Sequence, residues 1–432
     1  MTLNEERRSA IHLLRAGQRV NAVAAELGKS TRWVRKWRKR YEAEGWDGLK
    51  DRSRRPHKIT RQTSIDMRQA IRKTRSELEV GASEGNGLKY IGGQAIRTRL
   101  KEKGIQPLPS IPTIERVIRD AGMTRPYQHA NEPEIKYPHL KIEDSQSLIQ
   151  VDIVPHYLKG GERVACFNAI DVASRYPTGE AYAQRRSKEA EDFLIQVWQE
   201  LGIPKYTQVD NESCFSGGFT HPYVLGKVVR LALQSGTELI FSPVRHPQSN
   251  GFVERFHRDY DKHVWEDTYL SSITEVETQG QHFFALYRKR PHSRLNEQTP
   301  EVVHQAPTRL PLDLIPATTK RPLYAGQVHF IRKVLADNTI SILNVNWPIP
   351  NANSDQGVWA TLAIMPSGAK LIIFDDAPDV STRKRLAIHN FKLPEPVLPH
   401  PLSIPNVSTS FLSSAFRFFA RIFSRSLGGT MS

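Results

Sequence analysis

The sequence contains only two cysteines, Cys166 and Cys214, among its 432 residues. Two thiols are too few for a disulfide framework or a structural zinc cluster, so we expect free thiols in a reducing compartment. No apolar run is long enough to span a bilayer. Met1 is followed by charged residues instead of the apolar stretch of a secretory signal. These absences predict a soluble, cytoplasmic protein and argue against a membrane as its partner.

Acidic residues are also in deficit. The chain has 61 Lys and Arg but 45 Asp and Glu, which leaves a net charge of +16. Residues 1–60 hold sixteen of the basic and only seven of the acidic residues. Such a surplus favours a polyanionic partner, and nucleic acid is the usual one, because bound cations release the counterions of the phosphates.

The first sixty residues have the layout of a helix-turn-helix. Apolar periodicity predicts helices over 3–15 and 20–27, and Ser30 is a candidate N-cap for a third helix that ends near Glu44. In this layout the last helix enters the major groove of DNA. The alternative is a solvated basic face on a small bundle. The candidate DNA-contacting residues on the third helix are Arg32, Arg35, Lys36, Lys39 and Arg40.

A basic linker over 48–57 follows, and its Pro content makes it a poor helix. Its arginines are further candidates for DNA contact through a minor groove or phosphates: Arg52, Arg54 and Arg55. A second helical trio is predicted over 64–78, 93–103 and 111–121, with Arg116 and Arg119 facing outward. This second unit either binds DNA or serves only for packing.

Three carboxylates in the middle of the chain are candidate functional residues. Asp152 interrupts the apolar strand predicted over 148–154, and a buried carboxylate has no structural use unless it is paired or binds a cation. Asp210 ends a later strand, at the sheet edge where open α/β sheets bind ligands. Glu254 lies early in a helix that begins after Gly251. The side chains expected to pack that helix inward are Phe252, Val253, Phe256 and Tyr260.

Several ordered motifs resemble one known family. They are QVD at 150–152, DVASRY at 171–176, QVDN at 208–211, HPQSNGFVER at 246–255 and YRKRPHSRLNEQTP at 287–300. Together they resemble the retroviral-integrase-like core of insertion-sequence transposases, over roughly residues 5–305. The resemblance implies an RNase H-like fold in which Asp152, Asp210 and Glu254 are catalytic and hold two Mg²⁺ or Mn²⁺ ions. Carboxylate oxygens are the ligands that such hard cations prefer.

The chain departs from the family pattern in two places near this site. The 43 residues between Asp210 and Glu254 form a somewhat long gap. Glu212 stands where relatives often carry glycine, so it competes with Glu254 as the third ligand.

Other residues near this site have more than one interpretation. Asp171 and its Ser-Arg neighbours read as a strand-end turn, His246 and His257 contact either DNA or their local surroundings, and Arg255 and Arg258 are candidate phosphate contacts.

Alternating apolar and polar residues predict strands over 328–334, 339–345, 358–365 and 370–374, which we interpret as a small antiparallel barrel. It either holds DNA or serves as a scaffold. A Pro-rich linker then leads to a basic, Phe-rich helix over 411–425. Such a helix suits docking on an accessory protein or another protomer, with a membrane surface as the rival partner. Packing of the helix against the chain's own barrel is an equally open alternative.

The predicted fold class is multidomain: all-α helix-turn-helix units, a central α/β RNase H-like integrase core and a C-terminal small β-barrel. The expected domain boundaries are 1–58, 59–125, 140–305, 318–392 and 393–432. The predicted function is a DNA transposase that binds element ends, cleaves them with two metal ions and transfers the 3′ ends into target DNA. Its expected partners are double-stranded DNA and further copies of itself, as a dimer or larger. The alternatives are a DNA-binding factor with an inactive core and a nuclease that cleaves without joining.

Overall fold

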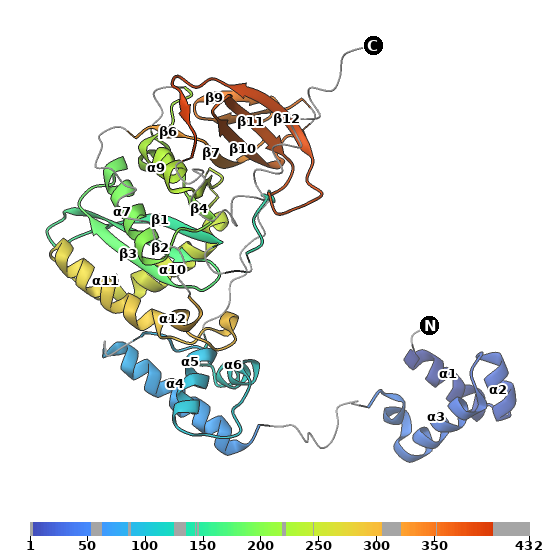
Figure 1. The fold of residues 1–432 in the computed structure, drawn as a ribbon. Helices are drawn as coiled ribbons and strands as arrows, with labels where there is room; N and C mark the ends of the chain where they lie inside the picture. Colours follow the sequence, from blue (N-terminus) through green and yellow to red (C-terminus); the bar gives the residue numbers. More distant parts are fainter. Residues whose placement is uncertain are drawn as a thin grey trace, which may run out of the picture. The chain divides into compact units, whose positions relative to one another are not determined.

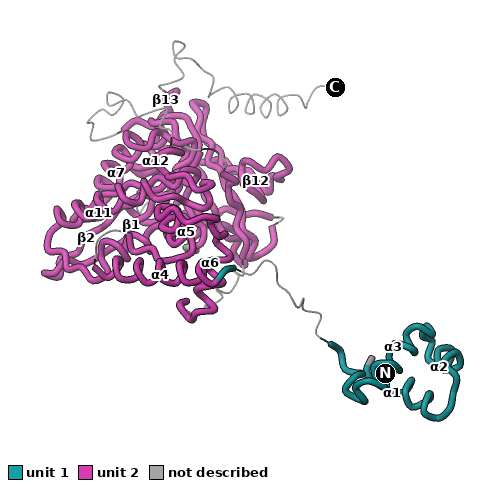
Figure 2. The backbone as a smooth tube through the Cα atoms, turned by 90° about the horizontal axis from the view of Figure 1, so that it is seen from below, with its two compact units in different colours: residues 1–64 teal, residues 65–432 magenta. Residues whose placement is uncertain are grey.

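The computed structural model describes residues 3–52, 63–84, 88–124, 135–142, 144, 147–217, 222–244, 246–304, 321–350 and 352–400. The chain divides into two compact units, residues 1–64 and residues 65–432 (Figure 2). Arg54, Arg55 and the C-terminal helix expected over 411–425 lie outside the described residues.

The first unit is the predicted helix-turn-helix. Its helices are α1 (Leu3–Arg15), α2 (Val20–Glu26) and α3 (Thr31–Glu44), and a 3-10 turn, Gly45–Leu49, follows. Ser30 caps α3 as expected, since its Oγ accepts a hydrogen bond from the Trp33 amide at 3.2 Å. Its buried side chains include Ala10, Ile11, Val23, Val34, Trp37 and Leu49.

Of the five cations expected on α3, Arg40 is held within the fold. The guanidinium groups of Arg7 and Arg40 lie 4.0 and 4.6 Å from the centre of the Trp37 ring. Both also donate to the end of the 3-10 turn Gly45–Leu49 and the residue after it: Arg7 to the Leu49 carbonyl and Arg40 to the Lys50 carbonyl, each at 2.8 Å. Arg40 therefore anchors the start of the linker. The other four cations are exposed: Arg32, Arg35, Lys36 and Lys39.

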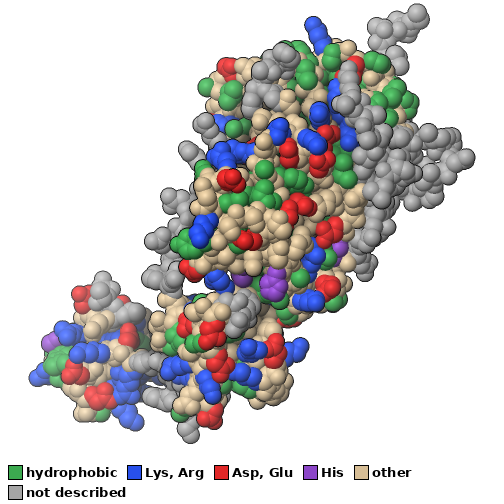
Figure 3. Space-filling model, turned by 90° about the vertical axis from the view of Figure 1, so that its left-hand side faces the viewer, with side chains coloured by type: hydrophobic (Ala, Val, Ile, Leu, Met, Phe, Trp, Pro, Cys, Tyr) green, Lys and Arg blue, Asp and Glu red, His purple; other side chains and the backbone are tan. Residues whose placement is uncertain are grey.

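The second helical trio is present as α4 (Ile65–Ser83), α5 (Gly93–Glu102) and α6 (Ile111–Asp120). Its core consists of Ile71, Ile96, Leu100, Ile114, Val117 and Ile118. Arg116 and Arg119 lie on the exposed side of α6, as predicted from the helical period. On the face of the molecule in Figure 3, Lys and Arg side chains on the helical bundles are interspersed with Asp and Glu.

The core begins with an antiparallel meander. Strands β1 (Leu148–Tyr157), β2 (Arg163–Asp171) and β3 (Pro177–Tyr182) pair in sequence order. On the other side of β1, β4 (Tyr206–Val209) and β5 (Glu238–Phe241) pair in parallel. The sequence pattern predicts β4 but neither β5 nor the helix that precedes it.

Helices cover both faces of this sheet (Figure 1). On one face, α7 (Ser187–Glu200) and α9 (Lys227–Ser235) pack against odd-numbered β1 residues such as Val151. On the other face lie α10 (Gly251–Tyr260) and α11 (Ile273–Arg288). Because side chains alternate along a strand, Asp152 points to the α10 side. Shorter segments are the helices α8 (Ser213–Ser216) and α12 (Pro300–Val303), the π turn Asp261–Trp265, and the 3-10 turns Pro247–Asn250 and Ser293–Leu295.

The C-terminal region is rich in strands, and all four predicted strands are present. The strands are β6 (Leu323–Tyr324), β7 (Gly326–Lys333), β8 (Thr339–Ile342), β9 (Val345–Pro348), β10 (Gly357–Met365), β11 (Gly368–Phe374), β12 (Arg385–Phe391) and β13 (Val397–Leu398). The expectation of a separate barrel needs correction. Within the described residues β7 pairs in parallel with β5, which gives one open sheet in the order β12-β11-β10-β7-β5-β4-β1-β2-β3.

The reason is the free edge of β5. Its residues Leu239, Ile240 and Phe241 are buried, and their backbone groups need partners that β7 supplies. The Phe241 and Phe330 rings stack across this junction, with centroids 5.1 Å apart. None of the helices in the described part of the chain is long and apolar enough to cross a membrane.

Candidate active site

The three carboxylates singled out from the sequence belong to elements that meet on the α10 side of the sheet. Gln150 of β1 pairs with Gln208 of β4, so Asp152 and Asp210 each lie two residues further along neighbouring parallel strands. Residues two apart on a strand share a face. Glu254 is in the first turn of α10, which packs on β1 and β2, and its side chain is half-buried.

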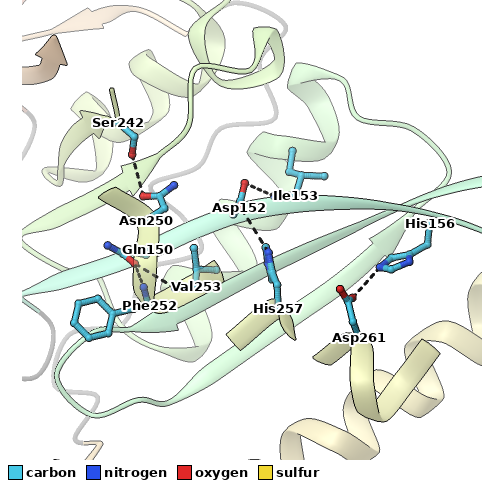
Figure 4. Close-up of polar contacts among 10 residues, drawn as sticks. All are labelled: Gln150, Asp152, Ile153, His156, Ser242, Asn250, Phe252, Val253, His257 and Asp261. Atoms are coloured by element: carbon cyan, nitrogen blue, oxygen red, sulfur yellow. Dashed lines mark hydrogen bonds and ion pairs between the residues drawn. The ribbon is translucent and has the colours of Figure 1, made fainter. Parts of the chain in front are cut away.

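Local contacts orient the two aspartates. Asp152 Oδ1 accepts a hydrogen bond from the Ile153 amide at 2.9 Å, and Asp152 Oδ2 lies 3.5 Å from Nδ1 of His257 (Figure 4). Asp210 Oδ1 accepts from the Glu212 amide at 2.9 Å. His257 is buried, and burial lowers the pKa of its imidazole to about 4. At neutral pH it therefore faces Asp152 as a neutral ring.

Burial raises the proton affinity of all three carboxylates, and neighbouring acids add to this effect at Asp152 and Asp210. Burial, and then the negative charges of Asp210, Glu254 and Glu212, raise the pKa of Asp152 to about 7. Burial and the charge of Glu212 raise the pKa of Asp210 to about 6, against the opposing hydrogen bond from the Glu212 amide. Burial raises the pKa of Glu254, and Arg258 opposes this shift. Such crowding of buried negative charge is favourable only when a cation or protons compensate it.

The donor set suits a hard divalent cation, since it consists of carboxylate oxygens. The arrangement is nevertheless open. Among the described residues, no three His, Cys, Asp or Glu side chains are grouped closely enough to hold a metal ion. Asp152 is turned towards His257 and Asp210 towards the Glu212 amide. The three carboxylates are therefore suitable metal ligands, and the elements that carry them meet at one place. The side chains of Asp152 and Asp210 would have to rotate before they could bind an ion together with Glu254.

Buried amide and hydroxyl groups tie the elements of the site together. Gln150 Nε2 donates to Gln208 Oε1 at 3.2 Å, and Gln208 Nε2 donates to Ser242 Oγ at 2.9 Å. Ser242 Oγ in turn donates to Asn250 Oδ1 at 2.9 Å, just before α10 (Figure 4). This network links β1, β4, β5 and α10 at positions close to all three carboxylates.

Gln150 also fixes the start of α10. Its Oε1 accepts hydrogen bonds from the amides of Phe252 and Val253 at 3.1 and 3.2 Å. These amides belong to the first turn of a helix and have no intrahelical acceptor. A side chain from β1 therefore caps the helix that carries Glu254, which sets the position of that helix relative to Asp152.

Arg332 of β7 reaches the same region from the C-terminal strands. Its Nη2 donates to Asn211 Oδ1 at 2.7 Å, its Nη1 to the Ser242 carbonyl at 3.1 Å and its Nε to the Ser341 carbonyl at 3.2 Å. Asn211 itself donates to the Ser242 carbonyl. Because Asn211 directly follows Asp210, the C-terminal region helps to hold the second carboxylate.

Glu212, the alternative third ligand, has another partner. Its Oε1 accepts from Arg185 Nη1 at 2.8 Å, in an ion pair whose side chains are 40% and 29% exposed. Glu212 contacts Asp210 through its backbone amide, while its carboxylate pairs with Arg185. This geometry favours Glu254 over Glu212 as the partner of the two aspartates.

Of the remaining residues near the site, some contact their neighbours in the sequence and others are exposed. Asp171 is a turn residue, as expected, because its Oδ1 accepts from both the amide and the hydroxyl of Ser174 at 2.6 and 2.7 Å. His246 contacts Ser249 Oγ at 2.9 Å. Arg255 and Arg258 are exposed on α10. The expectation that Phe252 packs inward is wrong: its side chain is 41% exposed.

The supporting roles of four residues are not predicted from the sequence: Gln150, Gln208, Ser242 and Arg332. The two glutamines carried a usable signal, because each precedes an aspartate by two residues and so shares its face of the sheet. Ser242 and Arg332 had none, since their contacts join segments that are far apart in the chain.

The raised pKa of Asp152 has a consequence for stability. The metal-free protein should be destabilised as pH rises from about 4, the ordinary aspartate value, through the folded value of about 7. Asp152→Asn removes the charge, so we expect it to stabilise metal-free protein at pH 8 by about 2–4 kcal/mol. The gain should shrink as pH falls towards 4.

Thermal unfolding of the two proteins in EDTA at several pH values measures this effect. Asp192→Asn is a suitable control, because it removes an exposed carboxylate from α7. An equal gain at pH 8 and near pH 4 would contradict the electrostatic explanation.

Comparisons with known proteins agree with this architecture. A winged helix-turn helix family model matches residues 7–69, and integrase core domain models match residues 143–247 and 235–300. The chain is similar to the putative integrase ORF3 of Spiroplasma virus SpV1-C74, with 26% identity over 181 residues, or 39% of this chain. That match spans 50% of the viral protein, so the chain spans about half the length of this curated relative.

Solved structures of viral integrases are also similar. The HTLV-2 integrase catalytic core domain in complex with magnesium matches with 14% identity and a TM-score of 0.29, over 38% of this chain and 98% of that one. The BIV integrase catalytic core domain matches with 17% identity and a TM-score of 0.29, over 37% and 93%. The simian T-cell lymphotropic virus intasome matches with 15% identity and a TM-score of 0.32, over 74% and 99%.

Proposed function

Because this chain carries a winged helix-turn-helix domain and an integrase core domain, which has the fold of DDE polynucleotidyl transferases, we propose that it is a DNA transposase. In this proposal it binds the ends of a DNA element, cleaves them and transfers their 3′ ends into target DNA. The observation that carries the proposal is the meeting of Asp152, Asp210 and Glu254 on adjoining elements of that core, with raised pKa values.

We propose that these three carboxylates are the catalytic residues and hold two Mg²⁺ or Mn²⁺ ions. When bound, such ions supply activation of the attacking oxygen and stabilisation of the leaving oxygen in an in-line displacement at phosphorus. The chain's own contribution is positioning. Gln150 and Ser242 fix the elements that carry the acids, and the neutral ring of His257 orients Asp152.

The DNA contacts proposed for this function come from several surfaces. The exposed cations of α3 would read the major groove, and the linker arginines Arg52, Arg54 and Arg55 would follow phosphates. Arg52 is exposed and pairs with Glu44, so this contact would have to be exchanged for DNA. Arg116, Arg119, Arg255 and Arg258 are exposed and would contact backbone phosphates. Holding two element ends together calls for a dimer or a larger assembly on DNA.

Labelled duplexes from the borders of the encoding DNA, incubated with the full chain and Mg²⁺ or Mn²⁺, test the proposal. We expect nicked products and products joined to a second duplex, both lost when EDTA is added. Binding of the border duplexes without nicking or joining would overturn the enzymatic function and support a DNA-binding factor with an inactive core. Nicking without joining would instead indicate a nuclease.

A further inference from the structure

Three arginines on or next to the active-site helix form no ion pair with the described part of the chain. Arg175 lies in the turn between β2 and β3, Arg255 follows Glu254 on α10, and Arg294 lies in the 3-10 turn after α11. We call them the arginine cluster. None of the three forms an ion pair with the residues that the structure describes. Arg255 and Arg294 are exposed, and Arg175 is half-buried.

The backbone holds Arg175 in a strained conformation. Its φ of 62° is in the left-handed region, which is unfavourable for a residue with a side chain. The turn is secured by Asp171, whose carbonyl accepts from the Arg175 amide at 2.9 Å. As a result, the Arg175 guanidinium lies 4.1 Å from the centre of the Phe252 ring, in the first turn of α10. Its Nη1 is buried and has no hydrogen-bond partner among the described residues.

The three positive charges are close enough to affect one another. Burial first, and then the charges of Arg255 and Arg294, lower the pKa of Arg175, against the opposing charge of Asp171. The same surroundings lower the pKa of His292 to about 3, through burial and then the charges of Arg290, Arg175 and Arg255. An unsatisfied buried donor among like charges is unfavourable unless an anion binds there.

One neighbouring cation is already engaged and does not belong to the cluster. The Arg290 guanidinium lies 3.3 Å from the centre of the Tyr90 ring, and its Nη1 lies 4.0 Å from Asp259 Oδ2. The arginine cluster therefore differs from Arg290 in having donors available for a ligand.

We propose that the arginine cluster binds backbone phosphate of the DNA strand that enters the active site. This inference rests on the proposed function and adds a substrate-binding site to it. Guanidinium groups match phosphate oxygens in charge and in their forked geometry. Arg255 is adjacent to Glu254, and Arg175 contacts the helix turn that Gln150 caps. A phosphate bound there lies beside the segment of the DNA strand on which the carboxylates act.

The salt dependence of DNA binding tests this site. Full-length protein in EDTA would be titrated with a short duplex of arbitrary sequence at several salt concentrations. Each lost phosphate contact should reduce the slope of log K against log salt by about one. We expect that reduction for Arg294→Gln, which alters an exposed side chain, and for Arg175→Gln. Arg175→Lys keeps the charge and should retain most of the slope.

Arg163→Gln is the matched control, because Arg163 is an exposed arginine at the opposite end of β2. It should leave the slope unchanged. Unaltered slopes for both Arg294→Gln and Arg175→Gln would overturn the phosphate site while the proposed function stands. An equal reduction for Arg163→Gln would also overturn it, since any surface cation would then suffice. If wild type fails to bind duplex DNA at all, the proposed function itself fails.

Discussion

Glu254→Gln should abolish cleavage and joining, with a loss of about 1000-fold or more, because a metal ligand contributes several kcal/mol to transition-state stabilisation. The change keeps the size of the side chain and removes one negative charge. Glu254 is half-buried in the first turn of α10, so the helix and its cap from Gln150 should remain. Affinity for border DNA should change by no more than about twofold.

Glu212→Gln is the matched comparison for this result. It makes the same chemical change 42 residues earlier, at a carboxylate that pairs with Arg185. We expect its activity to stay within about fivefold of wild type, because an exposed ion pair contributes about 1 kcal/mol or less. Single-turnover assays of nicking and joining would measure both variants. Loss of activity with Glu212→Gln and retention with Glu254→Gln would transfer the role of third ligand to Glu212.

Arg332→Gln should lower the joining rate about 100-fold, although Arg332 belongs to the C-terminal strands. Its guanidinium holds Asn211 and the Ser242 carbonyl, and a displacement of about 1 Å in a reacting group can cost that much. Because supporting contacts also tune metal affinity, the concentration of Mg²⁺ needed for half-maximal rate should rise about tenfold. DNA affinity should be preserved, since the guanidinium donors already have protein acceptors.

Lys333→Gln controls for the loss of a charge at this position. Lys333 is the next residue of β7 and pairs with Asp355 at the surface. Its replacement should leave the rate and the Mg²⁺ requirement unchanged. A purely structural role of Arg332 would lower the melting temperature without moving the Mg²⁺ requirement of the remaining active protein. Equal activity of the two variants would show that the C-terminal region does not support the site.

The local sequence pattern was sufficient to predict many of the helices and strands of this protein. The helical period predicts α1 to α6, since each buries one apolar stripe. An apolar run predicts β1, and the two-residue period predicts β7, β8, β10 and β11. Such features depend on residues within one turn of helix or one strand, so the amino-acid order alone expresses them. The family resemblance of the motifs, not their periodicity, implies that Asp152, Asp210 and Glu254 act together, and the structure places them on elements that meet.

Contacts between distant segments were decided by the tertiary structure. Parallel pairing of β5 with β7 joins residues about 90 positions apart, and no periodicity within either strand specifies its partner. The same holds for Arg40, which was expected to face DNA and instead holds the Lys50 carbonyl. Phe252 fits the apolar stripe of α10, yet it lies where Arg175 covers it rather than in the core.

The amino-acid order thus specifies which residue types could perform the chemistry and on which elements they lie. Packing of the folded chain specifies what supports them: Gln150 as the cap of α10, Ser242 at the centre of the buried network, and Arg332 beside Asn211. This is because a buried polar group must find a partner wherever the packed chain supplies one. That partner depends on the packing of whole elements and not on neighbours in the sequence.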